Sequence, residues 1–442
     1  MTASAGVVVR GVRLESALRK ARWRLIPLLS VCYLVAYMDR LNISFAAESM
    51  NRDLHFTAKI YGLGAGLFFL TYALCEIPSN RLLLRFGARR WMARIMLTWG
   101  LLAGAMVLVR TPASFYSLRM LLGMAEAGYF PGVIFYLAQW FPKHERARAI
   151  SLFYVALPLS SVVMGGLAGV LLGLNGKLGL AGWQWLFLVE ALPAIVLSVV
   201  IFFALPDGPG TAQWLQVEER EAVRTELARE DSLAGREGGV SDAGDLLAAL
   251  SSRHVWGFGV FFLCTLGSMY AVNFSLPIVL RAATGWSMGR VGWLIAGVGG
   301  LGAVSMIGAA IHSDRTGERK WHVVIPTVVM AGAMLVAGLR LDGWVGVAAL
   351  ALAAVSYYAV QGPMLSLCSA VLPGRAAAVG IAAINTCAIV GGFVGPNWMG
   401  WMREATGSYA VGVGGLSVPC LLAALSMIWL VKKETAGTRK RI

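Results

Sequence analysis

Charged residues are scarce in this sequence. Of its 442 residues, 14% are charged and 58% are hydrophobic, and the mean hydropathy is +0.69. Soluble domains contain about 25% charged and about 45–50% apolar residues, so this composition excludes an ordinary soluble domain. It predicts an all-α integral membrane protein that crosses the bilayer many times, because helices satisfy their own backbone hydrogen bonds in lipid.

The motifs of several function classes are also missing. None of the six cysteines forms a CxxC pair, and the five histidines lie in loops or at the ends of apolar stretches. Neither a disulfide framework nor a metal site is therefore predicted. There is no HExxH motif, and "LNGKL" at 174–178 lacks the spacing and the hydroxyl residue of a phosphate-binding GxxxxGK[ST] loop. We find no nucleophile constellation, so we expect no enzyme, no ATP-driven pump, no catalytic residues, no cofactor and no metal.

Apolar stretches of about 20 residues, the length that crosses a bilayer as a helix, recur twelve times. They cover 25–47, 58–78, 91–109, 115–139, 149–174, 184–205, 255–280, 291–311, 322–339, 344–372, 377–401 and 409–431. A polar interval at 206–253 divides them into two sets of six. We expect two six-helix bundles, 1–205 and 254–442, joined by a partly helical cytoplasmic linker, with a basic tail after the last helix.

The formal net charge of +15 comes from basic residues that cluster in short segments between the apolar stretches. This distribution argues for a lipid bilayer rather than nucleic acid as the partner. The positive-inside rule places both termini and the linker in the cytoplasm. The first apolar stretch is too long for a cleaved signal peptide, and the basic segment before it, 11–24, is either an interfacial helix or, more simply, a cytoplasmic anchor.

Two loops repeat the same pattern at matching places in the two halves. "SNRLLLRFGARR" (79–90) follows the second apolar stretch, and "HSDRTGERK" (312–320) follows the eighth. The matching positions are Arg85 with Arg315, Gly87 with Gly317 and Arg89 with Arg319. An acid precedes the arginine only in the second copy, where Asp314 stands opposite Leu84. The arginines alone fit ordinary topology determinants, but the paired glycines need another explanation.

This repeat in a twelve-span chain resembles the major facilitator superfamily, whose two halves are related by a pseudo-two-fold axis. The resemblance covers nearly the whole chain. It implies that these loops act as latches that close the cytoplasmic side, and that the first latch, which lacks its acid, is weaker as a charge pair.

Few ionisable residues lie inside the apolar stretches, and all of them belong to the first half: Asp39, Arg40, Glu76, Arg119, Glu126 and Glu190. Intramembrane charges are costly and usually mark ion or substrate pathways. The second half offers only neutral polar groups. We expect Glu76 and Glu190 to have structural or gating roles.

The stretch "YMDRLN" (37–42) places an acid and a base side by side. Neighbouring helical residues point about 100° apart, so Asp39 and Arg40 face different partners, one of them in the central cavity. Arg119 and Glu126, seven residues apart, share a helix face. If these helices pack together, a carboxylate that gains a proton frees an arginine to bind an anion. The alternative is a permanent structural ion-pair cluster.

Several neutral residues are candidate cavity contacts, although each also fits simple helix packing: Tyr72, Tyr270, Asn273, Gln361 and Asn385. Glycines at four-residue spacing predict close helix crossings, at Gly62 and Gly66, at Gly165 and Gly169, and at Gly391 and Gly395.

Further motifs resemble one branch of that superfamily, the anion:cation symporters, which include tartrate, phthalate and galactonate permeases. They are "YMDRLNI" (37–43), "RMLLGMAEAGYFPG" (119–132), "WFPKHERARA" (140–149), "AGWQWLFLVEALP" (181–193), "LPDGPGTAQWL" (205–215) and "HSDRTGERKWH" (312–322).

This resemblance implies a monomeric inner-membrane transporter that moves a small carboxylate together with protons. It assigns proton coupling to Asp39 and Glu126 and anion binding to Arg40 and Arg119. It also matches Tyr72 and Asn385 to substrate contacts. The competing hypothesis on the same scaffold is a proton-driven antiporter that exports drugs or metabolites, for which a cavity without paired arginines is expected.

Overall fold

The computed structural model describes residues 2–233, 251–371 and 376–430, and every regular element in these ranges is a helix. Eleven of the described segments are long and apolar enough to cross a membrane. With α15, a further helix of 31 residues, they form the expected twelve spans. Part of the predicted linker, 234–250, and the basic tail after residue 430 lie outside the described residues.

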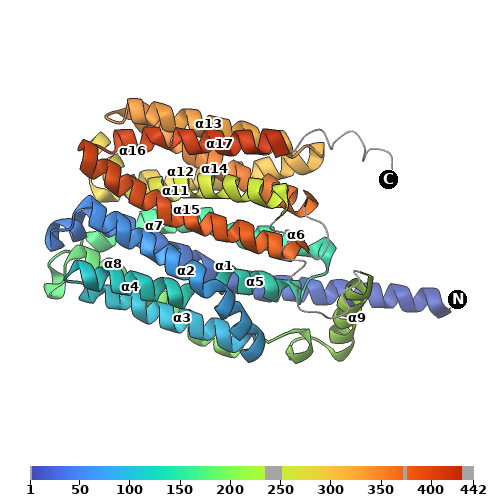
Figure 1. Ribbon diagram of the computed structural model, residues 1–442. Helices are drawn as coiled ribbons and strands as arrows, with labels where there is room; N and C mark the ends of the chain where they lie inside the picture. Colours follow the sequence, from blue (N-terminus) through green and yellow to red (C-terminus); the bar gives the residue numbers. More distant parts are fainter. Residues whose placement is uncertain (1, 234–250, 372–375, 431–442) are drawn as a thin grey trace.

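The twelve spans form two sets of six, and the two sets pack side by side (Figure 1). The first set contains α1 (Thr2–Leu54), α2 (Ala58–Phe86), α3 (Ala88–Ala105), α4 (Pro112–Glu126), α5 (Tyr129–Ala138), α6 (Lys143–Tyr154), α7 (Ala156–Leu172) and α8 (Gly182–Ala204). The second contains α11 (Arg253–Thr284), α12 (Met288–Thr316), α13 (Lys320–Leu339), α14 (Trp344–Val371), α15 (Ala376–Thr406), α16 (Ala410–Gly415) and α17 (Ser417–Leu430). In the sequence, α9 (Val217–Leu233) comes between the two sets. The pairs α4–α5, α6–α7 and α16–α17 each form one interrupted span.

The paired glycines of the two signature loops are helix C-caps. Gly87 ends α2 with φ +85°, and Gly317 ends α12 with φ +67°. Residues with a Cβ adopt positive φ at a cost, so glycine is the residue that ends a helix in this way. Backbone geometry therefore explains why both glycines recur, independently of any latch role for the arginines.

At the end of the bundle opposite α9, here called the far end, the two sets touch through their backbones. A Cβ on Gly62 of α2 would lie 2.6 Å from the Pro396 carbonyl oxygen of α15, and a Cβ on Gly165 of α7 would lie 2.2 Å from the Gly292 carbonyl oxygen of α12. Glycine lets helices approach this closely. The predicted glycine crossings are therefore confirmed, and the pairs α2–α15 and α7–α12 close the far end.

The first helix is much longer than the predicted span of 25–47, because the basic segment continues it without a break (Figure 1). Lys20 Nζ donates to both oxygens of Glu219 at 2.8 and 2.9 Å, and Ser16 Oγ donates to the same carboxylate at 2.8 Å. Arg22 pairs with Glu145 of α6. Burial raises the pKa of Glu219, but hydrogen bonds from Lys20, the Gln216 backbone and Ser16 outweigh it and leave that pKa below its usual value. The basic segment at 11–24 therefore binds α1 to α9 through Glu219.

Candidate functional site

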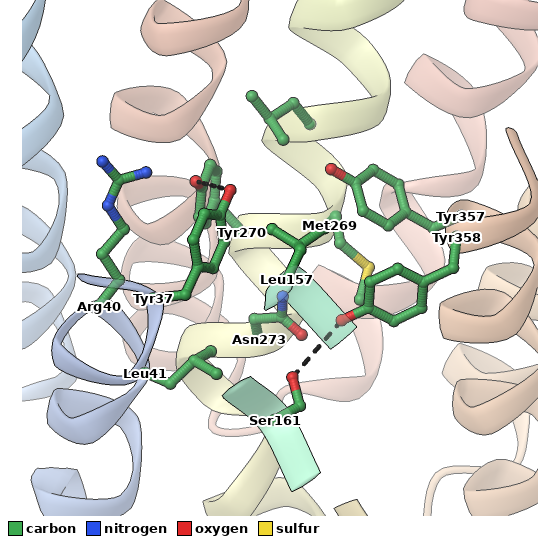
Figure 2. Close-up of a pocket in the computed structure, with 11 residues that line it drawn as sticks. Tyr37, Arg40, Leu41, Leu157, Ser161, Met269, Tyr270, Asn273, Tyr357 and Tyr358 are labelled. Carbon is green, nitrogen blue, oxygen red and sulfur yellow. Dashed lines mark hydrogen bonds between the residues drawn. The ribbon is translucent and has the colours of Figure 1, made fainter. Parts of the chain in front are cut away.

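A central cavity of about 110 Å³ lies between the two sets of helices. Its lining is largely aromatic and comes from both halves: Tyr33, Tyr37, Arg40, Phe69, Tyr72, Phe130, Tyr154, Leu157, Phe262, Leu266, Tyr270, Tyr357, Gln361, Asn385, Ala388 and Ile389. An adjoining cavity of about 20 Å³ shares Tyr37, Arg40 and Tyr270 and adds Ser161, Asn273 and Tyr358 (Figure 2). Among these lining residues, Arg40 is the one that carries a charge.

Arg40 of α1 is held by Glu126, the last residue of α4. Arg40 Nε and Nη2 both donate to Glu126 Oε1, at 2.9 and 2.5 Å. Glu126 is 1% exposed, and its second oxygen has no hydrogen-bond partner among the described residues. A buried ion pair of this kind is held together only while both partners are charged. Arg40 is therefore a cavity-facing cation, and two of its N–H donors are held by one buried acid.

Aromatic rings surround the Arg40 guanidinium. Its carbon atom lies 5.1 Å from the ring centroid of Tyr37, 5.6 Å from that of Phe68 and 5.2 Å from that of Tyr72. The negative faces of such rings attract a cation by about 0.5–2 kcal/mol each, more when water is excluded. These rings therefore help to stabilise the positive charge of Arg40 in the cavity.

Neither Asp39 nor Arg119 lines the cavity. For Asp39 this agrees with the helical angle of about 100° between it and Arg40. Asp39 is 3% exposed and accepts a hydrogen bond from Asn42 Nδ2 at 3.0 Å. Arg119 is 1% exposed, donates from Nε to the Gly64 carbonyl oxygen at 3.3 Å, and lies over Phe68. The Phe68 ring thus contacts both arginines. In this conformation the structure does not bring Arg119 to the cavity with Arg40.

Among the candidates of the second half, Tyr270, Gln361 and Asn385 line the central cavity and each has a partner, whereas Asn273 lines the adjoining cavity. The Tyr270 hydroxyl lies 3.5 Å from that of Tyr37 (Figure 2). Gln361 Nε2 donates to the Tyr357 carbonyl oxygen at 3.4 Å. Asn385 Nδ2 donates to Glu76 Oε1 at 2.7 Å, which joins α15 to α2 across the cavity. Tyr270 and Asn385 thus connect the halves around the space where a ligand would lie.

The signature loops differ in their charge partners. In the first loop Asp207, which follows α8, accepts from the Arg89 backbone N–H at 3.0 Å and lies 3.7 Å from Arg89 Nε. An acid from another segment thus stands beside the loop whose own acid is replaced by Leu84. Arg85 lies over the ring of Phe86. In the second loop Asp314 and Arg315 are exposed.

Sequence reasoning missed most of the tyrosines around the cavity, because an aromatic residue in a membrane helix usually packs. Tyr37, Tyr154 and Tyr357 line it, and the Tyr358 hydroxyl lies 3.5 Å from Ser161 Oγ (Figure 2). A usable signal was present in "SYYAVQG" (356–362), where two adjacent tyrosines precede Gln361 within one apolar span.

Comparison with known proteins places this site in context. Residues 29–396 match the model of the Major Facilitator Superfamily. A putative tartrate transporter of Agrobacterium vitis is 40% identical over 99% of this chain and 96% of its own length. A quinolone resistance transporter of Acinetobacter baumannii is 37% identical over 96% and 97% of the two chains. The inward-open structure of the xylose transporter XylE from E. coli superposes with a TM-score of 0.74, at 16% identity over 94% and 98% of the two chains.

Proposed function

The chain belongs to the major facilitator superfamily and is a multi-pass membrane transporter, not an enzyme, and on this premise we propose that it carries a small organic anion together with protons by alternating access. The observation that carries the proposal is the Arg40 guanidinium, which lines an aromatic cavity and is paired with one oxygen of buried Glu126. A guanidinium binds a carboxylate through two parallel hydrogen bonds, so the substrate class is a carboxylate.

Glu126 controls the binding site in this mechanism. While Glu126 is ionised, it competes with the substrate for Arg40. When Glu126 gains a proton, the ion pair is lost and Arg40 turns its donors to the substrate carboxylate. Proton and anion are then carried together, because each requires the other to be bound.

Asp39 and Arg119 form the second acid and base of the mechanism. Both are buried behind Arg40 rather than in the cavity. We propose that Asp39 is a proton site and that Arg119 approaches the substrate only in another conformation. Tyr72, Tyr270, Gln361 and Asn385 supply a ring face and neutral hydrogen bonds to the remainder of the substrate.

The far end faces the outside of the cell in this proposal, and both termini face the cytoplasm. The closed backbone contacts of α2–α15 and α7–α12 then correspond to an inward-facing state. The latch residues Arg85, Gly87, Arg89, Asp314, Arg315, Gly317 and Arg319 lie at the cytoplasmic side and close it in the opposite state. One chain contains a whole cavity, so we expect the monomer to be active.

The test uses purified protein in liposomes with a pH-sensitive dye inside. A panel of tartrate, sugar acids, phthalate and other carboxylates is added, and a panel of lipophilic cations is added separately. We expect one class of acid to acidify the lumen, with the signal lost in Arg40→Ala and kept in Arg290→Ala, a change at an exposed arginine in the first turn of α12.

Two results would contradict the proposal. Acid-driven acidification that is unchanged in Arg40→Ala would remove the anion site. Proton movement driven by the cations alone, with no response to any acid, would favour the drug-exporting antiporter, a class to which the name of the Acinetobacter baumannii relative points.

A further inference from the structure

A second cavity, larger than the central one, lies at the far end of the bundle. It has a volume of about 410 Å³ and is lined by both halves, through α1, α7 and α8 of the first and α11 and α12 of the second. Among the described residues that line it, Arg52 and Arg281 are bases and Glu48 is the one acid. The lining of this far-end cavity therefore carries an excess of positive charge, which favours an anion as its ligand.

Arg281 is paired with the acid of the other half. Its Nη1 atom, on α11, donates to Glu48 Oε2 of α1 at 3.0 Å. The two side chains are 43% and 33% exposed, and an ion pair with this much access to water adds little to stability. A guanidinium has five N–H donors, and Arg281 makes one hydrogen bond from them among the described residues. An anion in the cavity can therefore bind Arg281 and compete with Glu48 for it.

Arg52 is the second base of the far-end cavity, and its own ion pair is loose. Its Nε atom lies 3.7 Å from Asp53 Oδ1, too far for a hydrogen bond. The other oxygen of Asp53 accepts from the Trp183 indole N–H at 3.0 Å. Arg52 follows Glu48 by four residues, so the two side chains lie on the same face of α1. The donors of Arg52 are thus available to a ligand in this cavity.

One face of α1 leads from the central site to the far-end cavity. Tyr37 and Leu41 line the small cavity that adjoins the central one. Phe45, Glu48 and Arg52 line the far-end cavity. Successive members of this series are three or four residues apart, which is the spacing of side chains on one helix face. A ligand that moves along this face passes from one cavity to the other.

The helices α11 and α7 make the same connection. On α11, Tyr270 lines the central cavity, and Arg281, about three turns later, lines the far-end cavity. On α7, Ser161 lines the adjoining cavity, and Leu172, also about three turns later, lines the far-end cavity. Gly165, at which α7 crosses α12, lies between these two positions. The far-end cavity is therefore in line with the central site and on the outer side of this closed crossing.

We propose that the far-end cavity is a second binding site for a small carboxylate, in which Arg281 and Arg52 bind the substrate before it reaches Arg40. Binding there takes Arg281 from Glu48 and so removes an ion pair that joins the two halves. The closed far end then opens more readily when substrate is present. That the bound carboxylate is the transported one rests on the proposed function, whereas the anion site itself does not.

The first test measures binding without transport. Thermal unfolding of purified Arg40→Ala, whose central site has lost its base, is followed in detergent with tartrate, phthalate or gluconate, against sodium chloride at equal ionic strength. A ligand that binds only the folded state raises the unfolding temperature. We expect one of these acids to raise it in Arg40→Ala and equally after the further change Arg290→Ala, but not after Arg281→Ala. No shift with any acid, or an equal shift without Arg281, would overturn the proposal.

The second test separates a binding site from a simple gate, through the KM for uptake of the acid found by the liposome panel. Glu48→Gln loses the ion pair but frees Arg281, whereas Arg281→Ala loses both the ion pair and the base. We expect Glu48→Gln to lower the KM and Arg281→Ala to raise it by about three- to tenfold, a value reduced for solvent exposure. Arg290→Ala, at an exposed arginine outside the lining, should stay within about twofold of wild type.

A KM that moves in the same direction in Glu48→Gln and Arg281→Ala would reduce the pair to a gate and overturn the binding site. Proton-coupled uptake with an equal KM in wild type and Arg281→Ala would do the same and leave the proposed function intact. If no acid acidifies the lumen in the wild type, the proposed function fails. The unfolding measurements then still decide whether the far-end cavity binds a carboxylate.

Discussion

The residues of "YMDRLN" face two different surroundings, because helical residues turn by about 100° per position. Tyr37 and Arg40 face the cavity, whereas Asp39 and Asn42 are buried away from it and are hydrogen-bonded to each other. The charges that are so costly in a membrane helix are thus divided between a ligand-facing base and a buried acid. Arg40 is suited to its place because a guanidinium combines a planar fork of donors with faces that stack on rings.

At the residue scale, we expect the aromatic ring of Tyr72 to matter more for Arg40 than the Tyr72 hydroxyl does. Tyr72 lies 5.2 Å from the Arg40 guanidinium, and a cation–ring contact of this kind contributes about 0.5–2 kcal/mol. We expect Tyr72→Leu to raise the KM for the substrate by roughly 3- to 30-fold. Tyr72→Phe, which keeps the ring, serves as the control and should stay within about twofold of wild type. Equal losses in both variants would instead assign the effect to the hydroxyl.

Glycines determine how closely the helices of the two halves approach. At Gly165 a Cβ would lie 2.2 Å from a carbonyl oxygen of α12, whereas at the adjacent Gly166 it would lie 3.7 Å from the Trp293 ring, an ordinary contact. A Cβ therefore requires movement of the backbone at Gly165 but not at Gly166.

At the element scale, we expect Gly165→Ala to push α7 from α12 and to destabilise the state that is closed at the far end, by about 1–3 kcal/mol as for other overpacked sites. Thermal unfolding in detergent and uptake in liposomes measure this effect. Gly166→Ala should resemble wild type in both assays. Equal behaviour of the two variants would show that the α7–α12 crossing does not limit stability.

The docking of α1 on α9 depends on Glu219, whose pKa lies below its usual value. A carboxylate of this kind stabilises the docked state fully above the ordinary glutamate pKa of about 4.3 and loses that effect only as the pH falls through its lowered pKa. We expect Glu219→Gln to speed amide hydrogen exchange in α9 by about fivefold, the equivalent of about 1 kcal/mol. Wild-type protection should be equal at neutral and mildly acidic pH. Unchanged exchange in Glu219→Gln would contradict this role.

At the scale of the whole molecule, the twelve spans and their division into two sets could be predicted from apolar length and the repeated loops. The length of α1 could not, because its basic segment at 11–24 is stabilised by Glu219 and Glu145, which lie far away in sequence. A reading of local hydropathy does not detect such contacts. For the same reason, the sequence did not reveal that Asp207 would lie beside the loop that contains Leu84.

The sequence identified the charged residues of the site better than it identified how the side chains are arranged around the cavity. The sequence singled out Arg40 and Glu126 because charges inside apolar helices are rare. It did not predict that Arg119 lies outside the cavity lining, or that tyrosines from both halves form the cavity wall. Ring placement depends on how helices pack, and a single helix pattern does not contain that information.

The central claim is that a proton on Glu126 frees Arg40 for the anion, and Glu126→Gln tests it most directly. With the anion found by the substrate panel, exchange of internal for external anion and accumulation driven by a pH gradient are measured in the same liposomes. We predict that Glu126→Gln keeps exchange at a rate similar to wild type and loses accumulation driven by the pH gradient. Accumulation equal to wild type in Glu126→Gln would contradict the account.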